Sequence, residues 1–200
     1  MEKNLSMSSP GLRERKKQKT RWAIQEHAMR LFAQQGYDET TVEQIAAAAE
    51  ISPSTFFRYF KTKEDVVVQD RYDDLIVEKI AAAPAELSPI ATIRWTMREV
   101  FGALDVGEIE EGLARGRLIL ENQAVRSRSL QNMLAVTGAM SAALATRLGR
   151  PADDFRVRAL CGACLGAMIE SIMTWMIEGT QIVDLAKSID DALEVVENGI

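Results

Sequence analysis

The stretch from Thr40 to Lys63 constrains the fold more than any other part of the sequence. Thr41 is placed to cap a helix over residues 42–49, because a threonine hydroxyl can accept a hydrogen bond from a free first-turn N–H. Ser52 is placed to cap a second helix with Pro53 at its first position, where the missing N–H costs nothing. The stretch therefore predicts two short helices joined by a tight turn, a helix-turn-helix.

Residue spacing assigns the two faces of the second helix. Phe56 and Phe60 are four residues apart and are expected to be buried, together with Ile51 just before the helix. In a helix-turn-helix the second helix lies in the major groove of DNA, so its outward residues face base edges. Those residues are Pro53, Ser54, Phe57 and Arg58, with Thr55 able to touch base or phosphate. The side chains placed to bond phosphates are Thr41, Ser52, Tyr59 and Lys63.

A third helix precedes this pair. Apolar residues recur at helical spacing from about Arg13 to Gln35, and Gly36 is a natural stop. Its apolar face is expected to pack on the pair through Phe32. We call the resulting unit, residues 13–63, the head, and residues 64–200 the body.

Charge divides the chain in the same place. The chain has a net charge of -5, yet up to Lys63 it holds eleven Lys and Arg against seven Asp and Glu, whereas the rest is net acidic. Six basic residues and one acidic residue fall within residues 13–21. A basic head on an acidic body is typical of polyanion binding, and the basic run is expected to follow the DNA backbone or to enter a minor groove as an arm. The alternative is a solvated helix start.

The body reads as helices throughout. The pattern predicts helices over residues 62–83, with a possible break, and over 90–104, 111–121, 124–148, 154–178 and 183–198, with residues 105–111 as a loop. The sequence has no alternating strand-like run, so the predicted fold class is all-α. We expect no apolar run of membrane-span length and no secretion signal at the N-terminus. Residues 1–12 are expected to be disordered. The two cysteines fit a reducing compartment, so we expect a cytoplasmic protein.

The segment from Gly36 to Val66 carries a resemblance. G-Y-D-E-T-T-V-E-Q-I-A, followed by I-S-P-S-T-F-F-R-Y-F-K-T-K-E-D-V, resembles the DNA-binding head of the TetR family of bacterial one-component repressors. The resemblance implies a homodimer that binds a palindromic operator and is released by a small effector. It implies DNA contacts at Thr41, Ser52, Pro53, Ser54, Thr55, Phe57, Arg58, Tyr59 and Lys63. The chain departs from the family in the turn, where Glu50-Ile51 replaces the usual Gly-Val.

The body is expected to supply dimerisation and effector binding. The helix over 154–178 is apolar on more than one face, so the last two helices are expected to form a four-helix bundle with those of a second copy; the alternative is an internal helix of a monomer. The expected effector site is lined by Trp95, Arg98, Phe101, Arg117, Met133 and Met140. Within residues 111–199, the runs L-I-L-E-N-Q-A-V-R-S-R and A-L-A-T-R-L-G, followed by an apolar helix ending W-M-I-E-G, are similar to bodies of actinobacterial-type TetR regulators that sense acyl-CoA-like ligands. This resemblance implies an acyl chain among the methionines and phosphates near Arg98 or Arg117. The alternatives are plain core for the apolar residues and acidic partners for the arginines.

Other chemistry is not expected. Cys161 and Cys164 form a C-x-x-C inside an apolar helix, where we expect inert packing rather than redox or zinc chemistry. His27 is the only histidine, and no catalytic residues, metal site or cofactor are predicted. The remaining alternatives are a DNA-binding protein of this fold without an effector, and an activator.

Overall fold

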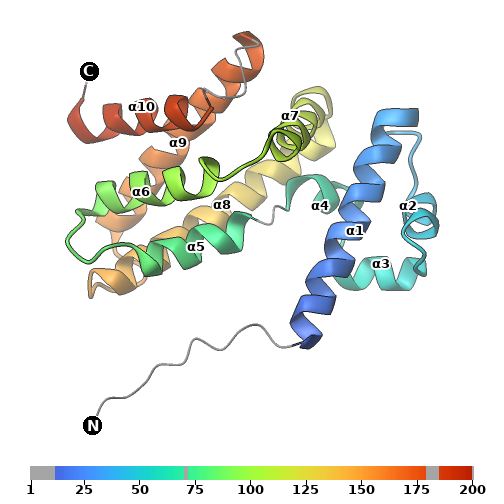
Figure 1. The fold of residues 1–200 in the computed structure, drawn as a ribbon, viewed down its shortest axis with the longest axis horizontal. Helices are drawn as coiled ribbons and strands as arrows, with labels where there is room; N and C mark the ends of the chain where they lie inside the picture. Colours follow the sequence, from blue (N-terminus) through green and yellow to red (C-terminus); the bar gives the residue numbers. More distant parts are fainter. Residues whose placement is uncertain (1–11, 70–71, 179–184, 200) are drawn as a thin grey trace. The chain divides into compact units, whose positions relative to one another are not determined.

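The computed structural model describes residues 12–69, 72–178 and 185–199, and the regular structure within these ranges is entirely α-helical (Figure 1). The predicted all-α class is confirmed. The chain divides into two compact units, which we call the N-terminal unit, Met1–Val67, and the C-terminal unit, Val68–Ile200. The division falls inside a short helix, four residues beyond the predicted end of the head. Of residues 1–12, which are expected to be disordered, only Leu12 is described, and it begins α1; the predicted helix start at Val183 lies outside the described residues.

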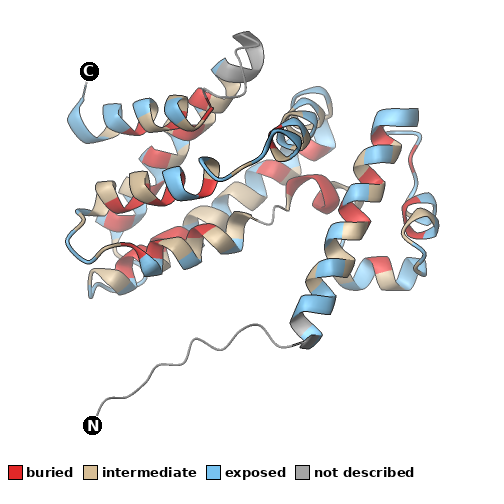
Figure 2. Ribbon diagram, viewed as in Figure 1, coloured by how far each residue is buried: buried red, intermediate tan, exposed pale blue. Residues whose placement is uncertain are grey.

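The N-terminal unit consists of α1 (Leu12–Gln35), α2 (Val42–Ala48), α3 (Pro53–Tyr59) and most of α4 (Lys63–Val68). Gly36 ends α1 with φ of 88°, a left-handed conformation that glycine adopts without a steric cost. The apolar face of α1 meets α2, and the buried side chains of the unit include Ile24, Phe32, Ile45, Phe56 and Phe60 (Figure 2). The predicted three-helix core is thus present, although Ile51 is only half-buried.

The C-terminal unit contains α5 (Tyr72–Ala82), α6 (Pro89–Phe101), α7 (Val106–Glu121), α8 (Gln123–Arg147), α9 (Phe155–Glu178) and α10 (Leu185–Asn198). The long helix α8 packs against α5, α7 and α9, while α10 packs against α6 and α9. One apolar core joins these helices and includes Ile80, Met97, Met140, Leu144 and Leu193.

Two boundaries differ most from the prediction, while the others differ by no more than three residues. The predicted helix over 62–83 is two helices, α4 and α5, with residues 70–71 between them outside the described ranges. The predicted loop over 105–111 is wrong, because α7 begins at Val106. Asp105 accepts a hydrogen bond from the N–H of Glu108, whose carboxylate accepts one from the N–H of Asp105, forming a capping box. The box satisfies the N–H groups of Asp105 and Glu108, so the helix begins here although Gly107 lies in its first turn.

Helix α9 is the most apolar helix of the body. Its segment Phe155–Thr174 has a mean hydropathy of 1.4 and is long and apolar enough to cross a membrane, so the expectation that no run reaches this length is wrong. Length and composition are weak grounds for a membrane span, because core helices pass the same test. Here α9 packs against α8 and α10 and contributes Val157, Cys161 and Cys164 to the core.

Candidate nucleic-acid interface

Helix α2 is fixed by its predicted cap. The hydroxyl of Thr41 accepts a hydrogen bond from the N–H of Gln44, and the amide oxygen of Gln44 accepts one from the N–H of Thr41. Such a cap is worth about 0.5–2 kcal/mol, a large contribution for a helix of seven residues. It also leaves Thr41 exposed at the helix N-terminus, where phosphates bind favourably.

The turn between α2 and α3 is a Schellman motif. The N–H of Glu50 donates to Ala47 O, and the N–H of Ile51 donates to Ala46 O at 2.9 Å. Glu50 holds the left-handed position with φ of 54°, the one non-glycine residue with positive φ in the described ranges. At the end of α8 the same motif has Gly149 in the equivalent position, with φ of 62°. The turn therefore forms without the glycine that is usual in the family, at a steric cost to Glu50.

Helix α3 has the two faces that the spacing predicts. Ser52 caps it by accepting from the N–H of Thr55, and Pro53 is its first residue. Phe56 and Phe60 are buried with ring centroids 5.8 Å apart, whereas Phe57 is 52% exposed. The remaining predicted contact residues on α3 are exposed or half-buried: Pro53, Ser54, Thr55, Arg58 and Tyr59. The structure thus brings the predicted base-facing side chains together on one open face.

Lys63 has a structural role that the sequence did not indicate. Its ammonium donates to Tyr37 O at 2.7 Å and to Thr40 O at 3.0 Å, and lies 4.0 Å from the centroid of the Tyr37 ring. Two of its three N–H donors therefore hold the link between α1 and α2, and one is left for a phosphate. The next residue, Glu64, accepts a hydrogen bond from the Tyr37 hydroxyl at 2.8 Å.

The pKa values of Tyr37 and Glu64 are both shifted from their ordinary values. Burial, and then the hydrogen bond to Glu64, raise the pKa of the Tyr37 hydroxyl above its ordinary value. Burial acts to raise the pKa of Glu64 as well, but hydrogen bonds from its own backbone N–H, Tyr37 and Thr62 outweigh burial and lower it. The start of α4 is thus fastened to the link that precedes α2.

The six predicted effector residues do not share one environment. Met140 lies in the core and Phe101 packs against it, while Trp95 and Met133 are half-buried. Arg117 is exposed, and Arg98 is exposed with its guanidinium bonded to Asp190 at 2.8 Å. The alternative that Arg98 pairs with an acid is therefore the one seen in this structure.

A neighbouring arginine ties α6 to α10. Arg94 donates to both carboxylate oxygens of Asp190 at 3.0 Å and also pairs with Glu194 and Glu197. Hydrogen bonds from Arg94, and then from Arg98, lower the pKa of Asp190 to about 2, although partial burial acts the other way. Sequence spacing alone could not pair residues almost a hundred positions apart.

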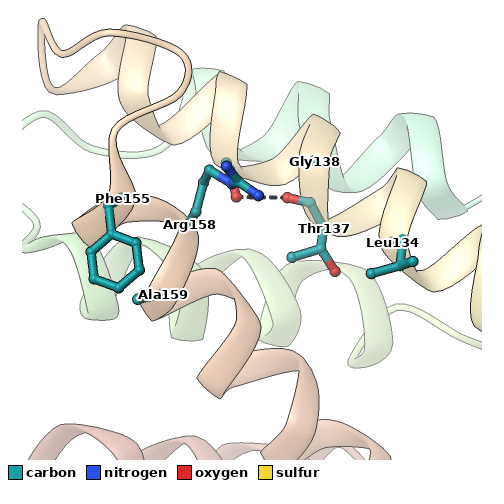
Figure 3. Close-up of a pocket in the computed structure, with 7 residues that line it drawn as sticks. Leu134, Thr137, Gly138, Phe155, Arg158 and Ala159 are labelled. Atoms are coloured by element: carbon teal, nitrogen blue, oxygen red, sulfur yellow. Dashed lines mark hydrogen bonds between the residues drawn. The ribbon is translucent and has the colours of Figure 1, made fainter.

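One face of α8 and α9 is not covered by any other described part of this chain. A groove of about 310 Å³ lies between these helices, lined by Leu134, Thr137, Gly138 and Ser141 of α8 and by Phe155, Arg158 and Ala159 of α9 (Figure 3). Leu134 is 77% exposed and Phe155 is 79% exposed. By contrast, α10 buries Leu185, Ile189 and Leu193 within its own unit.

The two cysteines are buried on the inner side of α9. Burial raises the pKa of the Cys164 thiol to about 12, and burial also raises that of Cys161 despite a hydrogen bond with Ser141. Thiols with raised pKa values are poor nucleophiles at neutral pH. Within the described residues, no group of three metal-ligating side chains comes together.

Comparisons with known proteins agree with this geometry. Residues 24–69 match the family model described as bacterial regulatory proteins, tetR family, and residues 87–200 match the MftR C-terminal domain. The HTH-type transcriptional regulator TcmR of Streptomyces glaucescens is 35% identical over 159 residues, which cover 76% of this chain and 70% of TcmR.

Two solved structures have a similar fold. FadR of Thermus thermophilus, a TetR family transcriptional repressor in complex with lauroyl-CoA, is 26% identical with a TM-score of 0.59, over 90% of this chain and 94% of FadR. SmeT, the repressor of the Stenotrophomonas maltophilia multidrug efflux pump SmeDEF, has a TM-score of 0.55 at 19% identity, over 90% of this chain and 89% of SmeT.

The capped helix pair, the outward face of α3 and the match of both units lead to one conclusion. The chain belongs to the TetR family of transcriptional regulators, which are DNA-binding proteins and not enzymes.

Proposed function

We propose that this protein is a cytoplasmic repressor that binds a palindromic operator as a homodimer and is released by a small hydrophobic or acyl-CoA-like effector. The observation that carries the DNA-binding part is the open face of α3, held by the buried pair Phe56 and Phe60. The proposed DNA surface comprises Thr41, Ser52, Pro53, Ser54, Thr55, Phe57, Arg58, Tyr59 and Lys63.

Phe57 is the sharpest test of base reading by α3. Its ring is half-exposed and can contact a thymine methyl group, which is an apolar readout of sequence. Phe57→Ala should lower affinity for the operator by about 1–3 kcal/mol per affected base pair while leaving affinity for random DNA unchanged. The measurement is fluorescence anisotropy with an operator selected from a random pool. Trp22→Ala, an exposed aromatic on α1, is the matched control. Equal losses on operator and random duplex would show that α3 does not read bases through Phe57.

The uncovered face of α8 and α9 supports a dimer built on these helices. Outside its own helix backbone, a Cβ added at Gly138, Gly162 or Gly166 would meet no described atom within 4 Å, so no described neighbour in the same chain requires these glycines. A glycine inside a helix costs about 1 kcal/mol relative to alanine, yet it permits close approach by another backbone. Together with the exposed Leu134 and Phe155, these glycines favour a second copy on this face.

This proposal revises the predicted role of α10. The apolar side of α10 faces α6 and α9 of the same chain, and three acidic residues of α10 pair with Arg94. We therefore expect the dimer contact to be made by α8 and α9 rather than by α9 and α10. Leu134→Glu should convert the dimer to monomer in sedimentation velocity runs. Val195→Glu, at a half-exposed valine of α10, should leave the dimer intact. If Val195→Glu dissociates the dimer and Leu134→Glu does not, the dimer contact is instead the bundle of α9 and α10 that the sequence predicts.

The effector class is proposed from the body. FadR, which shares this fold, was solved with lauroyl-CoA. We propose that the acyl chain lies near Trp95, Phe101, Met133 and Met140, where methionines adapt to chains of varied shape. Arg98 and Arg117 are proposed for the phosphates; because Arg98 already pairs with Asp190, Arg117 is the better anchor.

Titration with long-chain acyl-CoA tests this assignment. Lauroyl-CoA at micromolar concentration should release the protein from its operator, and Arg117→Ala should raise the concentration required without changing DNA affinity in its absence. Coenzyme A without an acyl chain is the control. If operator binding stays unchanged up to high micromolar acyl-CoA, the effector belongs to another class or the protein works without one.

A further inference from the structure

A basic hollow lies within the N-terminal unit, between the start of α1 and the C-terminal end of α3. Its volume is about 690 Å³, and the residues that line it are Arg13, Lys16, Lys17, Thr20, Arg58 and Tyr59. Four of the six side chains are cationic and the other two carry hydroxyls. A concave surface with cations and hydroxyl donors on its walls is suited to an anion with several oxygens.

The α1 side of the hollow is helical, and this decides between the two roles open to the basic run. Helix α1 begins at Leu12, so Arg13, Lys16 and Lys17 occupy positions i, i+3 and i+4 on one face. A minor-groove arm is an extended segment, because the groove is about 6 Å wide and a helix with its side chains is about 10–12 Å across. These three cations are therefore presented to a backbone running past the helix.

The α3 side holds Arg58 in the same hollow. The guanidinium carbon of Arg58 lies 5.5 Å from the centroid of the Tyr59 ring, and both side chains line the hollow. Arg21 of α1 lies over the ring of Phe60 at 4.9 Å, which tethers α1 to the end of α3. The hollow is thus formed by contacts inside the folded N-terminal unit.

We propose that this hollow takes the sugar–phosphate backbone of DNA on the flank of the half-site, and that Arg58 is a phosphate ligand together with Arg13 and Lys16. This rests on the proposed DNA-binding function and reassigns Arg58, which sequence spacing placed among the base readers. Base contacts are then made by the N-terminal and central part of α3, including Ser54 and Phe57. Arg58 and the start of α1 bind phosphates of one stretch of the DNA backbone. Such contacts fix register and affinity but carry no sequence information.

The salt dependence of binding measures this role. Each phosphate contact contributes about 0.9 to the slope of log affinity against log salt concentration on duplex DNA. Lys16→Ala and Arg58→Ala should each lower that slope by about one and weaken operator and random duplex by the same factor. Between 50 and 200 mM salt, the parent protein should lose about three- to four-fold more affinity than either variant.

Matched variants separate this site from general charge. Lys19→Ala removes the same charge from an exposed residue of α1 that does not line the hollow, and should change the slope by less than half as much. Lys16→Arg keeps the positive charge and should show the same salt slope as the parent protein. A duplex trimmed to the base pairs under α3 should abolish the difference between the parent and Lys16→Ala, because the flanking phosphates are gone.

Three results would overturn the proposal. Arg58→Ala could relax sequence preference at an unchanged salt slope, which would return Arg58 to base reading. Lys16→Ala could behave as Lys19→Ala does, so that only overall charge matters. Inorganic tripolyphosphate could bind the free protein through Lys16 as tightly as DNA does, which would make the hollow a small-anion site. Failure of the parent protein to bind any selected duplex is a separate outcome that refutes the DNA-binding function itself.

Discussion

Lys63→Met tests whether one ammonium group holds the N-terminal unit together as well as meeting DNA. Methionine keeps most of the stem but removes two hydrogen bonds to backbone carbonyls and the contact with the Tyr37 ring. Hydrogen bonds to charged groups are worth about 1.5–3 kcal/mol each, and a cation over an aromatic ring about 0.5–1 kcal/mol at an exposed site. Because Lys63 is half-buried and water can replace part of these contacts, we expect a loss of about 2 kcal/mol.

Lys61→Met is the matched control, because Lys61 is exposed and loses the same charge. It should change the free energy of unfolding by less than about 0.5 kcal/mol. The assay is hydrogen exchange of amides in residues 24–60 of the full chain, followed by mass spectrometry, with urea unfolding as a second measure. DNA affinity should fall for both variants, and more for Lys63→Met. Equal exchange in the two variants would refute the structural role and leave Lys63 as a phosphate ligand alone.

Three further predictions concern stability. Glu50→Gly should stabilise the protein by about 0.5–1 kcal/mol in urea unfolding. It removes the cost of a left-handed conformation at a residue with a Cβ, about 1–2 kcal/mol, but its more flexible unfolded chain costs about 0.5–1 kcal/mol. Glu50→Ala keeps the Cβ and should bring no such gain. Asp190→Asn should be less stable than the parent at neutral pH, and this difference in stability should disappear between about pH 4 and pH 2. The reason is that a carboxylate with a lowered pKa stabilises the fold above its ordinary pKa and no longer does so below its pKa in the folded state. A gap independent of pH would refute the ion-pair account. Arg147→Met should cost about 1–3 kcal/mol, because its guanidinium donates to the carbonyls of Ala83 and Pro84, just past the end of α5. A melting temperature unchanged within error would count against it.

The head was largely predictable because its determinants are local. The caps at Thr41 and Ser52 and the four-residue spacing of Phe56 and Phe60 each act within one or two helical turns, so sequence alone places the α3 face. The left-handed Glu50 was not predictable, because its conformation is imposed by the closing bonds of the turn rather than favoured by the residue. The structural role of Lys63 depends on carbonyls more than twenty residues away.

The body was less predictable because its helices are sorted by tertiary contacts. An apolar helix such as α9 has no single side that sequence can assign to core or partner, so the pairing of helices at the dimer contact could not be read from periodicity. The ion pairs of Arg94 show the same limit, since they join residues about a hundred positions apart. The start of α7 was missed for a local reason: Gly107 suggested a loop, whereas the capping box of Asp105 and Glu108 prevailed.

The short length of α2 and α3 has a consequence for how activity responds to temperature. Each helix has seven residues, and helices shorter than about 12–15 residues are marginal in water when isolated. Neither persists without the packing of Phe56 and Phe60 against the rest of the unit. The recognition surface therefore exists only while the whole unit is folded, and it melts cooperatively with it. On heating, the recognition surface is therefore lost together with the core of the unit, rather than one helix at a time.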